Sequence, residues 1–215
     1  MGGDIYVYIS AEDSVTIAII KRLLAFTSPR FKVFKNIPAR GGEIKSKIQE
    51  LNKLSETRPV VALLDLDANA CAPILKQSLL QGNAQNIDFI FNIAIDEAEA
   101  WLMADKVGFA RYFGISQQLI PDSSMQRMGG MKLVQELDSP MKSSLQLTHQ
   151  IMPSSINAEL RVQMMAQGKA AKGKEYNSAI VPFIDEVWDV TAASANSDSL
   201  RRMVKRLKNL ISRYP

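Results

Sequence analysis

Two aspartates separated by one residue follow an apolar run in the first third of the chain. Residues 59–64 read Pro-Val-Val-Ala-Leu-Leu, and Asp65 and Asp67 come directly after them with Leu66 in between. Residues two apart on a strand point to the same face, so the two carboxylates are expected to lie side by side. Neighbouring carboxylates repel each other unless one is protonated, both face water or a divalent cation lies between them. This strand end is therefore the first candidate site.

Acidic residues also follow two other apolar runs. Glu12 comes shortly after the run 5–9, and Glu97 and Glu99 follow the run 89–95. If these runs are parallel strands, their carboxyl ends lie at one edge of a sheet, which is where open α/β sheets bind ligands. Carboxylates without His or Cys favour Mg²⁺ or Mn²⁺, which take further ligands from water and phosphate. The predicted chemistry is metal-dependent cleavage or transfer of a phosphodiester.

Helix capping is the alternative explanation for the same side chains. Asp13 could join Ser10 in a capping box, Asp67 or Asn69 could cap the next helix, and Asp96 or Glu97 could occupy a first helical turn. A glycosidase-like acid/base pair is not favoured, because side chains two apart on a strand share one face and cannot flank a sugar ring. Metal binding and capping both stay open at this stage.

Strand and helix patterns alternate through the first half of the chain. Short apolar runs predict strands at 5–9, 31–34, 60–64 and 89–95, and apolar residues at helical spacing predict helices at 15–26, 43–54, 73–80 and 98–102. Strands joined by helices favour right-handed crossovers and a largely parallel sheet that is covered on both faces. We therefore predict an α/β fold.

The pattern changes after Gly114. Prolines and the pair Gly129-Gly130 interrupt short apolar segments there, and strand signals disappear. Helices are predicted at 156–166, 179–190 and 199–210, with capping residues for the last one at 196–199. The predicted organisation is an α/β domain over residues 1–115 and a mainly helical C-terminal extension over residues 116–215 that packs on it.

Composition limits the class of protein. The chain has 215 residues, of which 47% are hydrophobic and 22% charged, as is typical of a globular protein with a sizeable core. No apolar stretch reaches the roughly 18 residues of a membrane span, and the N-terminal residues lack a signal-peptide pattern, so a cytoplasmic protein is expected. The net charge of +4 favours a polyanionic partner.

Cysteine and tryptophan are predicted to be structural. Cys71 is the single cysteine and His149 the single histidine, which excludes a disulfide framework and disfavours a zinc site. We expect Cys71 to be a buried thiol without a catalytic role. Trp101 and Trp188 lie among apolar residues at helical spacing and are expected in the core.

Basic residues that could contact phosphate occur at three places. Lys172 and Lys174 lie in the glycine-containing segment 168–174, Arg201 lies near the start of the last predicted helix, and Arg40 precedes two glycines. Each could hold a phosphate backbone. The alternative is that these side chains only solvate an exposed loop or helix face.

Several strings of residues resemble a known family. Glu12 after the first strand and Asp-Leu-Asp at 65–67 after the third resemble the TOPRIM domain of topoisomerases, bacterial primases and overcoming-lysogenization-defect (OLD) nucleases. The string Ile-Asp-Glu-Ala-Glu-Ala-Trp-Leu-Met-Ala-Asp at 95–105 is similar to standalone TOPRIM-like bacterial proteins related to OLD-type nucleases. Lys-Glu-Tyr-Asn at 174–177 and Ser-Leu-Arg-Arg at 199–202 look like C-terminal signatures of the same family. The resemblance covers most of the chain and implies a TOPRIM-like Rossmannoid fold.

The same resemblance implies a Mg²⁺-dependent site. Glu12, Asp65 and Asp67 would be its metal ligands and catalytic residues, with Glu97 and Glu99 as further acidic members. The leading hypothesis is a nuclease or phosphodiesterase that uses Mg²⁺ or Mn²⁺ to cleave DNA or RNA. The alternatives are a non-catalytic module of the same fold that binds nucleic acid or a partner ATPase, and a phosphohydrolase of small phosphate compounds.

Overall fold

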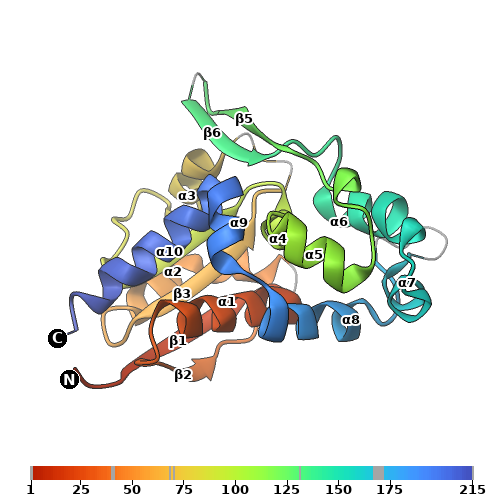
Figure 1. The fold of residues 1–215 in the computed structure, drawn as a ribbon. Coiled ribbons are helices and arrows are strands. Elements are labelled where there is room, and N and C mark those ends of the chain that lie inside the picture. Colours follow the sequence, from red (N-terminus) through yellow and green to blue (C-terminus); the bar gives the residue numbers. More distant parts are fainter. Residues whose placement is uncertain are drawn as a thin grey trace.

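A four-stranded parallel sheet in the order β2-β1-β3-β4 forms the centre of the protein (Figure 1). The computed structural model describes residues 2–39, 42–67, 69, 71–130, 132–166 and 172–214. The strands are β1 (Ile5–Ala11), β2 (Phe31–Asn36), β3 (Val60–Asp65) and β4 (Phe89–Ala94). Helices α1 (Ser14–Thr27), α2 (Glu43–Leu54) and α3 (Ala72–Leu80) connect them in turn. The predicted α/β fold is confirmed.

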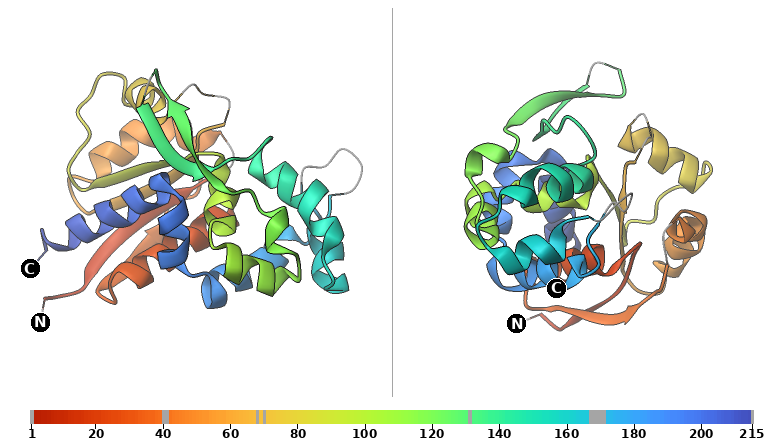
Figure 2. Two further views of the ribbon diagram at one scale, coloured as in Figure 1. Left: turned by 45° about the horizontal axis from the view of Figure 1, so that its top comes forward. Right: turned by 90° about the vertical axis from the view of Figure 1, so that its right-hand side faces the viewer.

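Both faces of the sheet are covered, which explains the continuous apolar sequence of β3. Val60, Ala62 and Leu64 pack with α2 and α3, whereas Val61 and Leu63 pack on the opposite face with α1 and the C-terminal helices. The right-hand view in Figure 2 shows α2 and α3 on one side of the sheet and the C-terminal helices on the other. By the same alternation, Asp65 ends the strand on the α1 side.

The second half of the chain is mainly helical, as predicted. Its main helices are α4 (Glu97–Met103), α5 (Lys106–Phe113), α6 (Ser143–Gln146), α7 (Ala158–Met164), α8 (Tyr176–Pro182), α9 (Val190–Asn196) and α10 (Asp198–Ile211). Two π-helical segments, η2 (Leu147–Ile151) and η4 (Phe183–Val187), and two short 3₁₀ turns, η1 (Gln117–Leu119) and η3 (Met152–Ser154), lie between them. The helix expected at 179–190 is therefore divided, with Pro182 lying where α8 gives way to η4.

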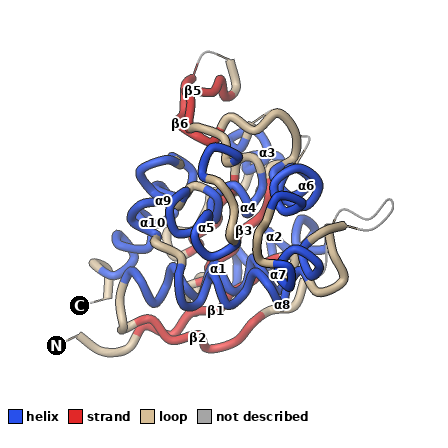
Figure 3. Tube along the Cα trace, turned by 45° about the vertical axis from the view of Figure 1, so that its right-hand side comes forward, coloured by secondary structure: helices blue, strands red, loops and turns tan. Residues whose placement is uncertain are grey.

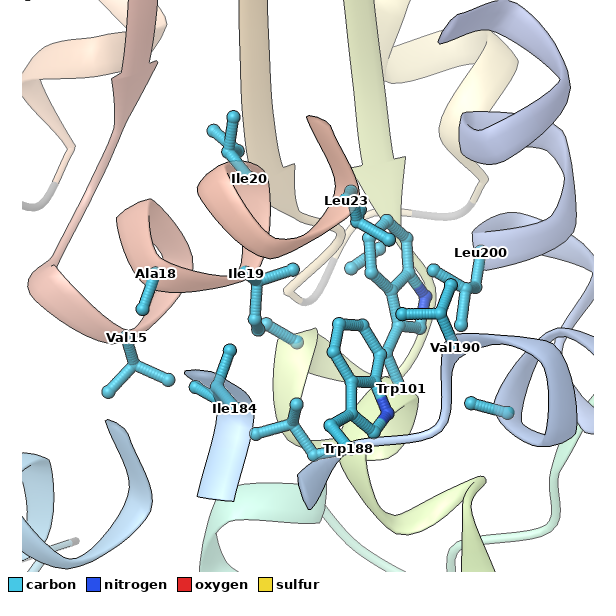
Figure 4. Packing of buried hydrophobic residues seen from close by; sticks show 14 of the residues in the cluster. Val15, Ala18, Ile19, Ile20, Leu23, Trp101, Ile184, Trp188, Val190 and Leu200 are labelled. Carbon is cyan, nitrogen blue, oxygen red and sulfur yellow. The ribbon is translucent and has the colours of Figure 1, made fainter. Parts of the chain in front are cut away.

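The main core joins the two halves of the chain. Trp101 from α4 and Trp188, which follows η4, are both fully buried against residues of α1, α9 and α10, such as Ile19, Val190 and Leu200 (Figure 4). The expectation that both tryptophans lie in the core is confirmed. Cys71 is also buried, as expected. Among the described residues, no helix is both long enough and apolar enough to span a membrane.

One expectation about the second half is wrong. Strands do not end at Gly114, because β5 (Ser123–Met128) and β6 (Lys132–Leu137) form an antiparallel hairpin. Gly129 and Gly130 have φ angles of 47° and 85°, the left-handed conformations that glycine adopts in tight turns. The glycine pair is thus the turn of a hairpin rather than a simple interruption. Figure 3 shows this hairpin projecting from the body of the molecule.

The capping expectations have mixed outcomes. Asp13 caps α1 by accepting a hydrogen bond from Thr16 N–H at 2.8 Å, and Ser197 caps α10. Ser10 does not join a capping box, because its hydroxyl donates to the Ile37 carbonyl. Neither Asp67 nor Asn69 caps α3, whose N-cap residue is Cys71 without a side-chain bond. Capping therefore accounts for Asp13 but leaves Asp67 to be explained.

Candidate functional site

The predicted acidic residues meet where the sheet ends. Asp65 is the last residue of β3 and pairs with Ala94 at the end of β4, while Ala11, next to Glu12, pairs with Leu63. The first turn of α4 then adds two more acidic side chains directly after β4. We call Glu12, Asp65, Asp67, Glu97 and Glu99 the acidic cluster.

Asp65 lies at the centre of this cluster. Its Oδ1 accepts a hydrogen bond of 2.9 Å from Ala98 N–H at the start of α4. Burial raises the pKa of Asp65 to about 8, and the negative charges of Glu99, Glu97 and Glu12 act in the same direction. This carboxyl group is therefore mostly protonated at neutral pH.

Glu12 has an unsatisfied oxygen. Its Oε1 is buried and has no hydrogen-bond partner among the residues that the structure describes. Burial raises the pKa of Glu12, and the charge of Asp67 adds to this effect. A pocket of about 430 Å³ lies beside Glu12 and Asp13, between α1 and the segment after β2. Buried polar atoms normally have partners, so this oxygen marks a place where a ligand would be stabilising.

Asp67 differs from the other members because two lysines neutralise it. Lys45 Nζ from α2 lies 2.9 Å from Oδ2, and Lys142 Nζ lies 3.3 Å from Oδ1. Burial acts to raise the pKa of Asp67, but its hydrogen bonds to these lysines and their charges outweigh burial and lower it. Asp67 also has a φ of 51°, so its position at the edge depends on a left-handed backbone.

Residues from the C-terminal half of the chain contact the Glu97 carboxylate. Its Oε2 accepts a hydrogen bond of 2.8 Å from Ser144 N–H at the start of α6, and its Oε1 lies 3.4 Å from Lys142 Nζ. The backbone φ angles of Asp96 and Glu97 are 59° and 72°. Left-handed backbone is costly for residues with a Cβ and often occurs at functional sites. Here it lets the chain turn sharply from β4 into α4.

Glu99 is the most buried member of the cluster, with an exposed fraction of 3%. Its Oε1 accepts a hydrogen bond of 3.0 Å from the Tyr176 hydroxyl and lies 2.7 Å from Lys172 Nζ. Lys172 Nζ also lies 3.7 Å from Asp13 Oδ2. Burial raises the pKa of Tyr176 well above its usual value, and the charge of Glu99 raises it further, so the phenol stays a proton donor.

The predicted basic residues do not all reach this cluster. Lys172 does, as described above. Lys174 is exposed and lines a surface pocket with residues of α7, including Glu159 and Gln163. Arg201 forms an ion pair with Asp198 on its own helix, and no ion pair with the acidic cluster is seen in the described part of the chain. Arg40 lies outside the described residues.

Sequence reasoning missed two lysines of the site. Lys45 and Lys142 both contact Asp67, but they lie 22 and 75 residues away from it in the chain. Nothing in the local sequence of either lysine distinguishes it from an exposed one, so only the folded structure reveals them. Tyr176 belongs to a string that supported the family resemblance, although it had no assigned role.

The cluster offers the oxygen ligands that Mg²⁺ prefers, including the unpartnered oxygen of Glu12. Within the described residues, no group of three or more acidic, His or Cys side chains is arranged to hold a metal ion. Mg²⁺ commonly uses one or two carboxylates and keeps several waters. A closed protein cage for a metal ion is therefore not seen in the described part of the chain, and a cation at this cluster would need water for the rest of its ligand shell.

Comparison of the chain with protein-family models, with curated proteins and with solved structures gives no match. The TOPRIM-like resemblance thus stays an expectation that depends on the residues themselves.

Proposed function

We propose that the protein is a Mg²⁺- or Mn²⁺-dependent phosphodiesterase that cleaves DNA or RNA at the acidic cluster. The observation that supports this most is the convergence of Glu12 after β1, Asp65 at the end of β3 and Glu99 in the first turn of α4. Burial at this place, together with the charges of the neighbouring carboxylates, raises the pKa of Asp65 to about 8. Such crowding of carboxylates in a partly buried place is typical of functional sites. A divalent cation is the ligand that relieves it most directly.

Different members of the cluster would have different roles. Glu12, Asp65 and Asp67 would hold the cation, and Glu97 or Glu99 would complete the ligand set through water. The cation would activate a water molecule and neutralise charge on the phosphate. Glu12 has the unpartnered oxygen and a raised pKa, so it would also accept the proton of the attacking water.

Lysines of the site would stabilise the phosphate. Lys142 and Lys172 now pair with carboxylates of the acidic cluster. A cation bound to those carboxylates would free both ammonium groups to contact phosphate oxygens. Among the other predicted basic residues, Lys174 and Arg201 would act only on more distant parts of a polymer, and Arg40 stays a prediction.

The test is cleavage of labelled single- and double-stranded DNA and RNA by the purified protein with Mg²⁺ or Mn²⁺. Asp65→Asn is expected to lower the rate about a hundredfold or more, since it removes a ligand charge. Asp122→Asn is the matched control, because the Asp122 side chain is 96% exposed and, among the residues that the structure describes, its one ion pair is with Lys106. Mononucleotide substrates in the same assay separate a nuclease from a phosphohydrolase of small compounds.

A non-catalytic module for nucleic acid or a partner ATPase is the second candidate. The ion pairs of Lys45, Lys142 and Lys172 favour it, because they already neutralise part of the acidic cluster. Steeply salt-dependent binding of nucleic acid without turnover would support this candidate over the first. The cytoplasmic location stays a prediction from the sequence.

A further inference from the structure

A second pocket lies beside the outer edge of β4, the last strand of the sheet. Its volume is about 240 Å³, and no member of the acidic cluster lines it. It is enclosed by α3, α10 and the β5–β6 hairpin, which lie near one another in Figure 1. A Cβ at Gly129 would lie 2.7 Å from Cys71 Sγ, so the hairpin turn closely approaches the start of α3. We call this cavity the β4 pocket.

Positive charge dominates the lining of the β4 pocket. Lys76, Lys132, Arg202 and Arg206 line it, and no acidic residue is found among the described lining residues. Among described residues, the only ion pair that any of these four forms is a long one of 3.9 Å between Arg202 and Asp198. Arg206 donates instead to the neutral side chain of Asn92, and Lys76 Nζ lies 5.0 Å from the centre of the Phe91 ring.

These cations lie close enough to repel one another. Burial and, to a smaller extent, the charge of Arg206 together lower the pKa of Lys76 to about 7. Burial also lowers the pKa of Arg206, with a second contribution from Arg202. Partly buried cations without a counter-ion are unfavourable, and an anion placed between them would stabilise each one.

The remaining lining suits an organic body attached to the anion. Ile74, Ile93, Ile95, Met128 and Val134 supply apolar walls. Helix α3 begins at the pocket and has no side-chain cap, so the positive end of its dipole adds to the favourable potential for an anion, although Pro73 in its first turn has no N–H to donate. The volume lies below the roughly 300–1,000 Å³ of pockets for drug-sized ligands, which indicates a small ligand.

We propose that the β4 pocket binds a phosphate monoester with an apolar or aromatic body, of the class of nucleoside monophosphates. A phosphate monoester carries about −1.5 to −2 charges at neutral pH and accepts several charged hydrogen bonds, which matches a set of arginines and lysines better than a single carboxylate does. A free mononucleotide and the 5′-phosphorylated end of a short strand present this same group. The site is separate from the acidic cluster and does not depend on the proposed cleavage activity.

The experiment is calorimetric titration of the full chain, without divalent cations, with AMP, adenosine, inorganic phosphate and a 5′-phosphorylated trinucleotide. AMP is expected to bind at least about tenfold more tightly than adenosine or inorganic phosphate, because only AMP uses both the cations and the apolar wall. Binding of the trinucleotide but not of AMP would show that the pocket binds the 5′-phosphate of a strand end rather than a free mononucleotide. Failure of both phosphorylated ligands to bind, or equal binding of AMP and adenosine, would overturn the proposal.

Matched variants locate the binding. Arg206→Gln is expected to weaken AMP binding about tenfold or more, since it removes a charged donor. Lys208→Gln removes the same charge from the same helix but lies outside the pocket, and it is expected to bind AMP like the wild type. Lys132→Gln, at the start of β6 and exposed, serves as a second pocket variant if Arg206→Gln does not fold. Equal binding by the pocket variants and the control would contradict the assignment.

Discussion

Asp65 is buried beside other carboxylates at its strand end, and this environment makes the stability of the protein depend on pH. Its pKa is raised to about 8 in the folded state, mainly by burial, from 3.8 when unperturbed. Between these values the folded state binds more protons than the unfolded state, so the free energy of unfolding falls as the pH rises. The stability associated with protonated Asp65 is complete below about pH 4 and is lost as the pH passes through about 8.

Asp65→Asn is therefore expected to flatten the pH dependence of stability. Asparagine mimics the protonated acid and can still accept the hydrogen bond from Ala98 N–H. In urea unfolding with a chelator, the variant should match the wild type near pH 5 and exceed it near pH 9. Some slope should persist, because burial also raises the pKa of Glu136 to about 7. A variant that is less stable than the wild type at pH 9 would contradict the raised pKa of Asp65.

The ion pair between Glu99 and Lys172 is expected to stabilise the fold as a pair. Substitutions of the two residues should therefore have non-additive effects on the free energy of unfolding. Lys172→Met removes the counter-charge of the Glu99 carboxylate, which is only 3% exposed. We expect this substitution to lower the free energy of unfolding by about 1–3 kcal/mol. In the double variant Lys172→Met/Glu99→Gln, much of that loss should be recovered, because no unpaired charge is left. A double-mutant cycle measured by urea unfolding tests this, and additive single effects would argue against the pair.

At the level of residues, the sequence identified acidic partners better than basic ones. Glu12, Asp65 and Glu99 could be predicted because parallel strands place their carboxyl ends at one edge. Lys142 could not be predicted, since its contact with Asp67 depends on how the segment before α6 returns to the sheet. Its position is set by tertiary packing and not by any local pattern.

At the level of elements, the strands of the sheet and their connecting helices could be predicted from local sequence patterns. The helix predicted at 43–54 is α2 with the same bounds, because Ile44, Ile48 and Leu51 form one buried stripe. The β5–β6 hairpin was not predicted, because its strands read Ser-Ser-Met-Gln-Arg-Met and Lys-Leu-Val-Gln-Glu-Leu. The two strands together contain a single β-branched residue, so their β-propensity is weak. The stability of the hairpin comes from contacts with distant elements instead.

Glu136 is the main polar contact that fixes this hairpin to α10. It is fully buried, and its carboxyl oxygens accept hydrogen bonds from Ser197 Oγ at 2.5 Å and Ser199 N–H at 2.6 Å. Ser199 Oγ in turn accepts a hydrogen bond from Trp101 Nε1. One carboxyl group therefore joins β6, the start of α10 and α4.

Glu136→Ala is expected to lower the free energy of unfolding by about 2–4 kcal/mol, because it leaves two buried donors without an acceptor. Glu136→Gln keeps a hydrogen-bond acceptor, so it should lower the free energy of unfolding clearly less than Glu136→Ala does. Glu159→Ala, at an exposed position of α7, should have little effect. Urea unfolding measures all three variants, and equal losses for Ala and Gln at position 136 would show that these hydrogen bonds are unimportant.

At the scale of the whole molecule, one core connects the sheet to the C-terminal helices. Residues of β1 and α1 pack in the same apolar cluster as Trp188, Leu200 and Leu207. The same arrangement brings Lys142 and Lys172 from the second half of the chain to carboxylates of the first. The acidic cluster is thus assembled by the entire fold, and its charge balance depends on both halves.

Metal binding at the acidic cluster is tested most directly by calorimetric titration of the metal-free protein with Mn²⁺ at pH 7 and pH 9. We expect binding that is tighter at pH 9, because the cation must displace the proton that Asp65 holds below about pH 8. Asp65→Asn should abolish this binding, whereas Asp122→Asn should leave it unchanged. Mn²⁺ binding of equal strength in the wild type and in Asp65→Asn would show that the acidic cluster is not the metal site.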